Sequence, residues 1–131
     1  SIARGVEALE GGAAGGAVLI ALVDQPAVPP DVIRQLLDAR IRTGARLAVP
    51  VWEGRGGHPV LVELGFREEL LSLDARGGLR ALFDAHRREV LRVPVDSPFV
   101  TRDMDTWEDY RALHAEVFGS EPTCSAASER R

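Results

Sequence analysis

A run of seven apolar residues, 17–23, is the feature that most constrains how this chain can fold. An unbroken apolar run of this length is typical of a strand that is buried on both faces, and such strands occur mostly in parallel sheets covered by helices. Ligand sites in these sheets lie beyond the carboxyl ends of the strands. Asp24, which follows the run directly, is therefore a candidate site residue, although an Asp before Pro26 also fits a turn with no further role.

Composition sets the limits of what the protein can be. Its 131 residues are enough for one modest domain with its own core. The formal net charge of −4 argues weakly against nucleic-acid binding. The chain has no lysine, so its positive side chains are all arginine. The single cysteine, Cys124, excludes an internal disulfide. No apolar run approaches the roughly 20 residues of a membrane span, so we expect a cytoplasmic protein with no membrane contact.

Periodicity, caps and chain breakers predict an alternation of helices and strands. The expected helices cover 1–10, 30–43, 66–73, 79–86 and 107–117, and the expected strands cover 17–23, 46–52, 58–62, 89–95 and 99–104. Pro50 inside the second strand suggests an edge position or a bulge. The alternation predicts an α/β fold with a mostly parallel, Rossmann-like sheet flanked by helices. We expect residues 1–118 to form the domain and residues 119–131 to be a disordered tail.

The segment 54–59, Gly-Arg-Gly-Gly-His-Pro, is a second candidate site. Its glycines allow a ligand to approach the backbone and leave N–H groups for an anion, while Arg55 adds charge and His58 a hydrogen bond. The alternative is a hairpin tip in which the glycines serve only the turn.

The third candidate is the acidic pair Asp103 and Asp105. Acids at i and i+2 point the same way if the backbone is extended. Together with Asp24 they would form an oxygen cage for a hard cation such as Mg²⁺, which also relieves the repulsion between neighbouring carboxylates. The alternative is that one of these acids caps the last helix.

Five segments, taken in order, resemble the molybdenum cofactor cytidylyltransferase family, within the nucleotidyltransferases of the nucleotide-diphospho-sugar transferase fold. The segments are residues 1–9 (SIARGVEAL), 18–26 (VLIALVDQP), 49–60 (VPVWEGRGGHPV), 76–82 (RGGLRAL) and 103–109 (DMDTWED). The resemblance implies transfer of CMP or GMP from a nucleoside triphosphate to the terminal phosphate of a pterin cofactor, with Mg²⁺ bridging phosphates and pyrophosphate released. It implies the following roles: Asp24 and Asp105 catalytic and metal-binding; Asp103 a further metal ligand; Gln25, Pro26, Arg55, Gly57 and His58 substrate-binding.

Two departures from the family pattern stand out. The family's amino-terminal nucleotide loop is absent, so the chain resembles the carboxy-terminal portion of a complete enzyme. We expect more chain before Ser1, or a partner, to cover the edge of the strand at 18–23, because an unpaired apolar edge invites aggregation. The second departure is Trp107, which stands where the family has a proline. Two other readings stay open: a related transferase with a sugar phosphate or another phosphorylated acceptor, and a non-catalytic module that holds the cofactor.

Overall fold

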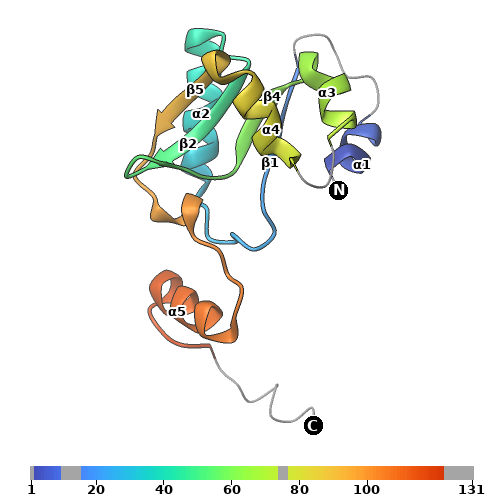
Figure 1. Ribbon diagram of the computed structural model, residues 1–131. Helices are drawn as coiled ribbons and strands as arrows, with labels where there is room; N and C mark the ends of the chain where they lie inside the picture. The colour runs from blue at the N-terminus through green and yellow to red at the C-terminus, as the bar shows by residue number, and fades with distance from the viewer. Residues whose placement is uncertain (1, 10–15, 74–76, 123–131) are drawn as a thin grey trace.

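The computed structural model describes residues 2–9, 16–73 and 77–122. The α-helices are α1 (Ile2–Glu7), α2 (Pro30–Thr43), α3 (Arg67–Leu71), α4 (Gly78–Ala85) and α5 (Trp107–Phe118). The strands are β1 (Ala17–Ile20), β2 (Leu47–Trp52), β3 (Arg55–Gly56), β4 (Val60–Glu63) and β5 (Val90–Pro94). Three short 3₁₀ helices, η1 (Leu64–Phe66), η2 (Arg87–Glu89) and η3 (Pro98–Thr101), join them (Figure 1).

The α/β class and the flanking helices are confirmed, but the sheet is mixed rather than mostly parallel. The described strands follow the order β1-β4-β2-β3, and β5 pairs with β2. Only the β2–β5 pair is parallel among these, because β4 runs antiparallel to both β1 and β2. The strands β1, β2 and β5 consequently point the same way, so their carboxyl ends lie at one edge of the sheet.

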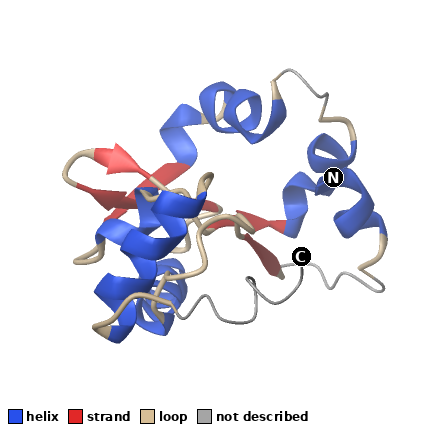
Figure 2. Cartoon of the chain, turned by 90° about the horizontal axis from the view of Figure 1, so that it is seen from below, coloured by secondary structure: helices blue, strands red, loops and turns tan. Residues whose placement is uncertain are grey.

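Helices cover both faces of the sheet (Figures 1 and 2). On one face, α2 packs Val32, Leu36 and Ala39 against the sheet residues Ala48 and Leu61. On the other face, a second cluster joins α1, α3 and α4 to the strands, through Val6, Leu47, Val60, Val62, Phe66, Leu70 and Leu82. The chain therefore buries two apolar layers, one on each side of a single sheet.

Local sequence signals set the ends of α2 and α5. Pro30 occupies the first turn of α2, and Gly44, with φ of 71°, ends it in the left-handed conformation that glycine adopts most easily. Thr106 and Asp109 form the predicted capping box at the start of α5. Trp107, the first residue of that helix, packs its ring against Tyr110 with centroids 5.1 Å apart.

The apolar run 17–23 is less buried than the sequence predicts. Only residues 17–20 form β1, their burial alternates between exposed and half-buried, and Val23 is 97% exposed. The prediction of a strand buried on both faces is wrong because, within the part of the chain that the structure describes, β1 pairs on one side only, with β4. β1 is thus an edge strand of the described sheet, as expected for a strand whose second neighbour is missing from the described residues.

Two further expectations need correction. Residues 99–104 do not form a strand: the chain enters η3, where the Ser97 hydroxyl accepts a hydrogen bond from the Phe99 N–H. Pro50 does not lie on an edge strand either, because β2 is central. Residues 47 and 48 of β2 pair with β4, and residues 51 and 52 pair with β3. Pro50 lies between these two pairs, so neither β4 nor β3 requires the N–H group that proline lacks.

A disordered tail was expected at residues 119–131. Residues 123–131 of this segment lie outside the described residues.

Candidate functional site

Three carboxylates converge beyond the carboxyl ends of the strands. One oxygen from each of Asp24, Asp103 and Asp105 lies within 4.8 Å of the other two. Asp24 belongs to the turn after β1, and the other two acids belong to the segment between η3 and α5. The structure thus brings together the acids named from the sequence, although Asp103 and Asp105 do not follow a strand as expected.

Hydrogen bonds hold the two acidic segments against each other. The N–H of Met104 donates to the carbonyl oxygen of Asp24 at 2.8 Å. The side-chain amide of Gln25 donates from Nε2 to Oδ1 of Asp103 at 2.7 Å. Gln25 is only 7% exposed, and its Oε1 has no hydrogen-bond partner among the described residues. An unpaired buried carbonyl oxygen is costly, so this atom is an exception among the buried polar groups of the described chain.

The capping box of α5 fixes the backbone of Asp105. Oδ2 of Asp109 accepts the N–H groups of Asp105 and Thr106, each at 3.1 Å, while the Thr106 hydroxyl accepts the N–H of Asp109 at 3.0 Å. The backbone N–H groups of Asp105 and Thr106 lower the pKa of Asp109, because they stabilise its ionised form. Asp109 is therefore a positioning group for Asp105.

The three carboxylates disfavour one another's charge. The pKa of Asp105 is raised, first by partial loss of solvent and then by the charges of Asp24 and Asp103. A divalent cation would replace this repulsion with attraction, and carboxylate oxygens are the donors that Mg²⁺ and Mn²⁺ prefer. The donor set of three carboxylates therefore fits a hard divalent cation.

Gly57 serves packing rather than anion binding. Its N–H donates to the carbonyl oxygen of Pro50 at 2.8 Å, so it is not free for a ligand, contrary to the expectation for this loop. A Cβ at position 57 would lie 2.1 Å from the carbonyl oxygen of Val100. The next N–H, that of His58, donates to the same Val100 oxygen at 2.9 Å. The loop is thus pinned onto η3, which leads to the acidic segment.

The His58 side chain lies near the acids. Burial lowers the pKa of this half-buried imidazole, and the charges of Asp103 and Asp24 act in the opposite direction. Arg55 is exposed on β3, and Pro26 is exposed beside an apolar groove along α5. Contact with a substrate therefore stays a prediction for Gln25, Pro26, Arg55, Gly57 and His58.

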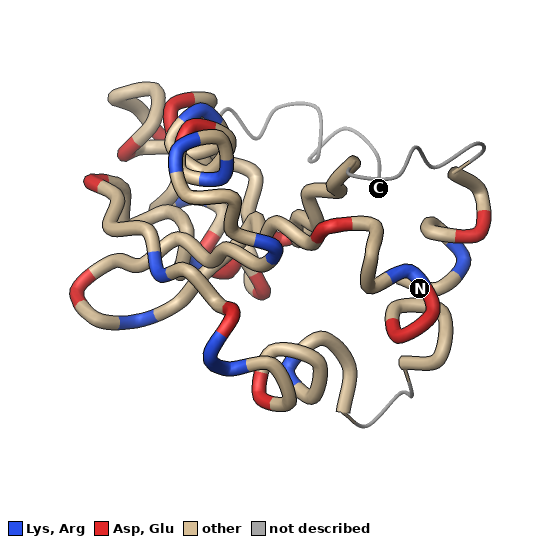
Figure 3. The backbone as a smooth tube through the Cα atoms, turned by 90° about the horizontal axis from the view of Figure 1, so that it is seen from above, with Lys and Arg blue, Asp and Glu red and all other residues tan. Residues whose placement is uncertain are grey.

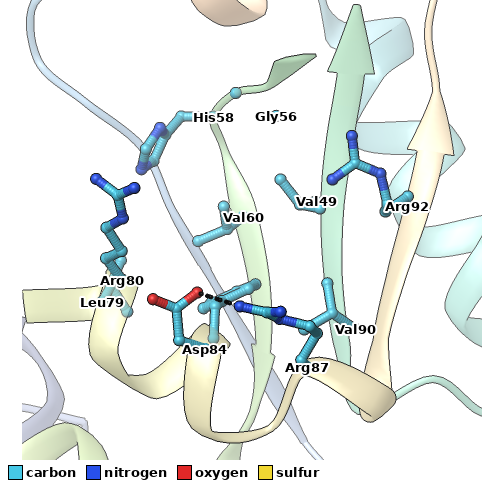
Figure 4. Close-up of a pocket in the computed structure, with 12 residues that line it drawn as sticks. Val49, Gly56, His58, Val60, Leu79, Arg80, Asp84, Arg87, Val90 and Arg92 are labelled. Atoms are coloured by element: carbon cyan, nitrogen blue, oxygen red, sulfur yellow. Dashed lines mark ion pairs between the residues drawn. The ribbon is translucent and has the colours of Figure 1, made fainter. Parts of the chain in front are cut away.

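Arg80, for which the sequence pattern predicted no role, lines a pocket of about 760 Å³ together with His58. Arg87 and Arg92 line the same pocket (Figure 4). The sequence signal for Arg80 is the segment Arg76-Gly-Gly-Leu-Arg80, which resembles the corresponding segment of the family. Which residues of α4 face the sheet could not be read from that short segment.

The charged residues are spread over the described chain. Acidic and basic positions are interspersed along the described chain rather than gathered on one basic face (Figure 3). None of the helices in the described ranges is both long and apolar enough to cross a membrane.

Comparisons with known proteins place this geometry in a family. The model of the MobA-like NTP transferase domain matches residues 1–90, a range that contains Asp24, His58 and Arg80 but ends before Asp103. No curated protein matches the sequence.

Solved structures from mycobacteria are similar over most of the chain. A homologue of Mycobacterium tuberculosis Rv0371c from Mycobacterium sp. strain JC1 is 30% identical over 89% of this chain, with a TM-score of 0.72. The manganese complex of Rv0371c from M. tuberculosis H37Rv is 29% identical over 86%, with a TM-score of 0.70. The chain spans 57% and 58% of these two structures, respectively. The match to the domain model, the fold and the sequence similarity together show that the chain belongs to the MobA-like NTP transferase domain family, a family of nucleotidyltransferases.

Proposed function

We propose that this chain is the carboxy-terminal portion of a divalent-cation-dependent nucleotidyltransferase that moves CMP or GMP from a nucleoside triphosphate to the molybdenum cofactor. The observation that carries the proposal is the convergence of Asp24, Asp103 and Asp105 within 4.8 Å. Acids this close, from segments far apart in the sequence, suit a bound cation better than they suit an empty surface. The manganese complex of the similar Rv0371c supports a divalent cation here, with Mg²⁺ the other candidate.

The chemistry is an in-line displacement. An oxygen of the acceptor's terminal phosphate forms a bond to the α-phosphorus of the triphosphate. The bond from that phosphorus to the bridging oxygen breaks, and its electron pair leaves with pyrophosphate. When bound by the three acids, a divalent cation would supply the positive charge that offsets the charge on the phosphate oxygens.

The protein's own residues provide positions rather than covalent bonds. Asp24, Asp103 and Asp105 would hold the cation, and Gln25 orients Asp103 through its 2.7 Å hydrogen bond. Residues that orient a metal ligand in this way usually matter almost as much as the ligand itself. The pinned backbone of Gly57 and His58 forms the wall beside the acids on which the acceptor lies.

The test is release of pyrophosphate by the complete protein from CTP or GTP, with the pterin cofactor and Mg²⁺ or Mn²⁺. Asp24→Asn keeps the shape of the side chain and removes its charge, so we expect turnover to fall by about 100-fold or more. Asp38→Asn is the matched control, because Asp38 is exposed on α2 and outside the cluster. Full turnover in the Asp24 variant would contradict the metal role.

Assays with several acceptors distinguish the proposed function from the two alternatives. Turnover with sugar phosphates but not with the pterin would overturn the acceptor and leave the metal site intact. Tight binding of the pterin cofactor with no release of pyrophosphate, under any nucleotide and cation, would favour a non-catalytic cofactor carrier instead.

A further inference from the structure

A second set of charged groups lies on the α4 face of the sheet, separate from the three acids. It lines the pocket of about 760 Å³, with the loop at His58 on one side, Arg80 and Arg87 from α4 and η2, and Arg92 from β5. The side chains of His58 and Arg80 point toward one another (Figure 4). A pocket of this size is within the range that small organic molecules occupy.

The positive charge in this pocket is only partly used by the protein. Arg87 pairs weakly with Asp84, at 3.7 Å, and Arg92 donates to the carbonyl oxygen of Gly54 at 2.8 Å. Arg80 makes no hydrogen bond or ion pair to any residue in the described ranges. Three guanidinium groups therefore face one carboxylate, and the guanidinium of Arg80 is left for an anion from outside.

The floor of the pocket is apolar. The sheet contributes Val49, Val60 and Val90, and α4 contributes Leu79 and Phe83. Side chains of this kind take the carbon framework of a ligand, while a few polar groups at the rim fix its orientation. The expected ligand therefore has an apolar or ring-shaped body and at least one anionic group.

His58 is the residue that relates the pocket to the acids. This residue lines the pocket, and it lies close enough to Asp24 and Asp103 for their charges to act on its imidazole. A nucleotidyltransferase must bring two polyanions together, and their mutual repulsion requires separate positive partners. In the proposed function the three acids would hold the cation that accompanies the triphosphate, so the second anion would need a cationic pocket of its own.

We propose that the Arg80 pocket binds the acceptor as an organic phosphate, with Arg80 as the principal partner of an anionic group and the apolar floor under the ring. Calling this ligand the acceptor depends on the function proposed above, whereas the binding of an organic phosphate does not. Arg80 is thereby a binding residue for the substrate that receives the nucleotide.

The experiment measures binding of phenyl phosphate to the complete protein by calorimetry, without a divalent cation, so that the three acids take no part. We expect Arg80→Ala to raise the dissociation constant about 10-fold or more, since a hydrogen bond to a charged group has about that effect. Phenol, which lacks the anion, should bind weakly to both proteins. Arg42→Ala, an equal loss of charge at an exposed position of α2, should bind phenyl phosphate normally.

A second measurement identifies which substrate uses the pocket. The affinity for Mn²⁺-CTP should be unchanged in Arg80→Ala, whereas the KM for the pterin acceptor should rise. Weaker binding of Mn²⁺-CTP with unaltered binding of phenyl phosphate would overturn the proposal, because the pocket would then hold the nucleotide. Equal binding of phenyl phosphate by the wild type and the variant would also overturn it.

The two proposals fail separately. If Asp24→Asn retains turnover while Arg80→Ala loses phenyl phosphate, the metal role fails and the anion pocket stands. If Arg80→Ala does not fold, which its thermal transition would reveal, Arg80→Lys retains the charge but loses the two-pronged geometry, and it should bind phenyl phosphate more weakly than the wild type does. Wild-type affinity in the lysine variant would then refute the two-pronged contact between Arg80 and the phosphate.

Discussion

The side-chain amide of Gln25 donates a 2.7 Å hydrogen bond to Asp103, although 78 positions separate the two residues in the sequence. This contact joins the turn after β1 to the segment before α5, which are the two sources of carboxylates. Because Gln25 is buried, its amide has a fixed position, and the partly buried bond holds the exposed Asp103 carboxylate in one direction.

Removing this contact tests its role in cation binding. We expect Gln25→Leu to weaken Mn²⁺ binding about 10-fold, the lower end of the effect of losing a group that orients a metal ligand. No carboxylate is lost, so charge cannot explain the change. Gln35→Leu on α2 is the matched control, and electron paramagnetic resonance of free Mn²⁺ measures both. Equal affinities would show that Asp103 needs no such support.

Asp109 offers a test of the backbone around Asp105. We expect Asp109→Ala to cost about 1 kcal/mol of stability, as the loss of a cap does, and to weaken Mn²⁺ binding because the N–H of Asp105 loses its acceptor. Asp109→Glu should retain both properties, since Glu is the commoner partner in a capping box. Glu108→Ala removes an equal charge at the adjacent position, and it should change neither the stability nor the binding of Mn²⁺. Titration of Mn²⁺ and urea unfolding distinguish these outcomes.

Much of the fold could be predicted because its signals are local. The bounds of α2 follow from Pro30 and Gly44, and the capping box of α5 is visible in Thr106 and Asp109. Asp24 could be chosen because it follows an apolar strand, whereas Asp103 and Asp105 were chosen as a pair of acids at i and i+2 after a strand that the structure does not contain.

Other features depend on contacts that no local pattern records. The exposure of β1 follows from its place at the edge, not from its seven apolar residues. Phe99 and Val100 look like a strand, but the Ser97 hydroxyl turns the chain into η3. Arg80 could not be assigned to a pocket without knowing which face of α4 meets the sheet.

Gly57 should tolerate no side chain. A Cβ there would lie 2.1 Å from the Val100 carbonyl oxygen, a backbone atom that cannot move without disturbing η3. We expect Gly57→Ala to lower the free energy of unfolding by about 3 kcal/mol or more. Gly5→Ala in α1, where no atom lies within 4 Å of the added carbon, should instead raise it by about 0.5–1 kcal/mol. Urea unfolding of both variants measures the contrast, and a neutral effect at position 57 would contradict the close packing.

Glu63 links pH to stability. Its carboxylate, 19% exposed, accepts hydrogen bonds from Arg40 at 2.9 Å and Arg46 at 3.0 Å, and these lower its pKa from the ordinary value of 4.5. The folded protein therefore releases this proton more readily than the unfolded chain does. The stabilisation is complete above the unfolded-state pKa and is lost as the pH falls through the lower folded-state pKa.

We accordingly expect Glu63→Gln to cost about 2 kcal/mol at pH 7, since it removes the charge that accepts a hydrogen bond from both Arg40 and Arg46. The difference from the wild type should shrink as the pH falls below 4.5. Glu68→Gln, an exposed neighbour on α3, should be neutral throughout. Thermal unfolding between pH 3 and pH 7 tests the profile, and a constant difference would contradict the ionic origin of the effect.

The hydrogen bond between Met104 and Asp24 has a mechanical consequence. An ion held by Asp24 and Asp105 would link these two residues, so the chain between them would form a closed loop like that of a disulfide. Unlike a disulfide, this link could be opened by a chelator. A force that pulls on the two ends of the chain would then act on the bound ion, and β2, β4 and β5 would carry no load until the ion is released.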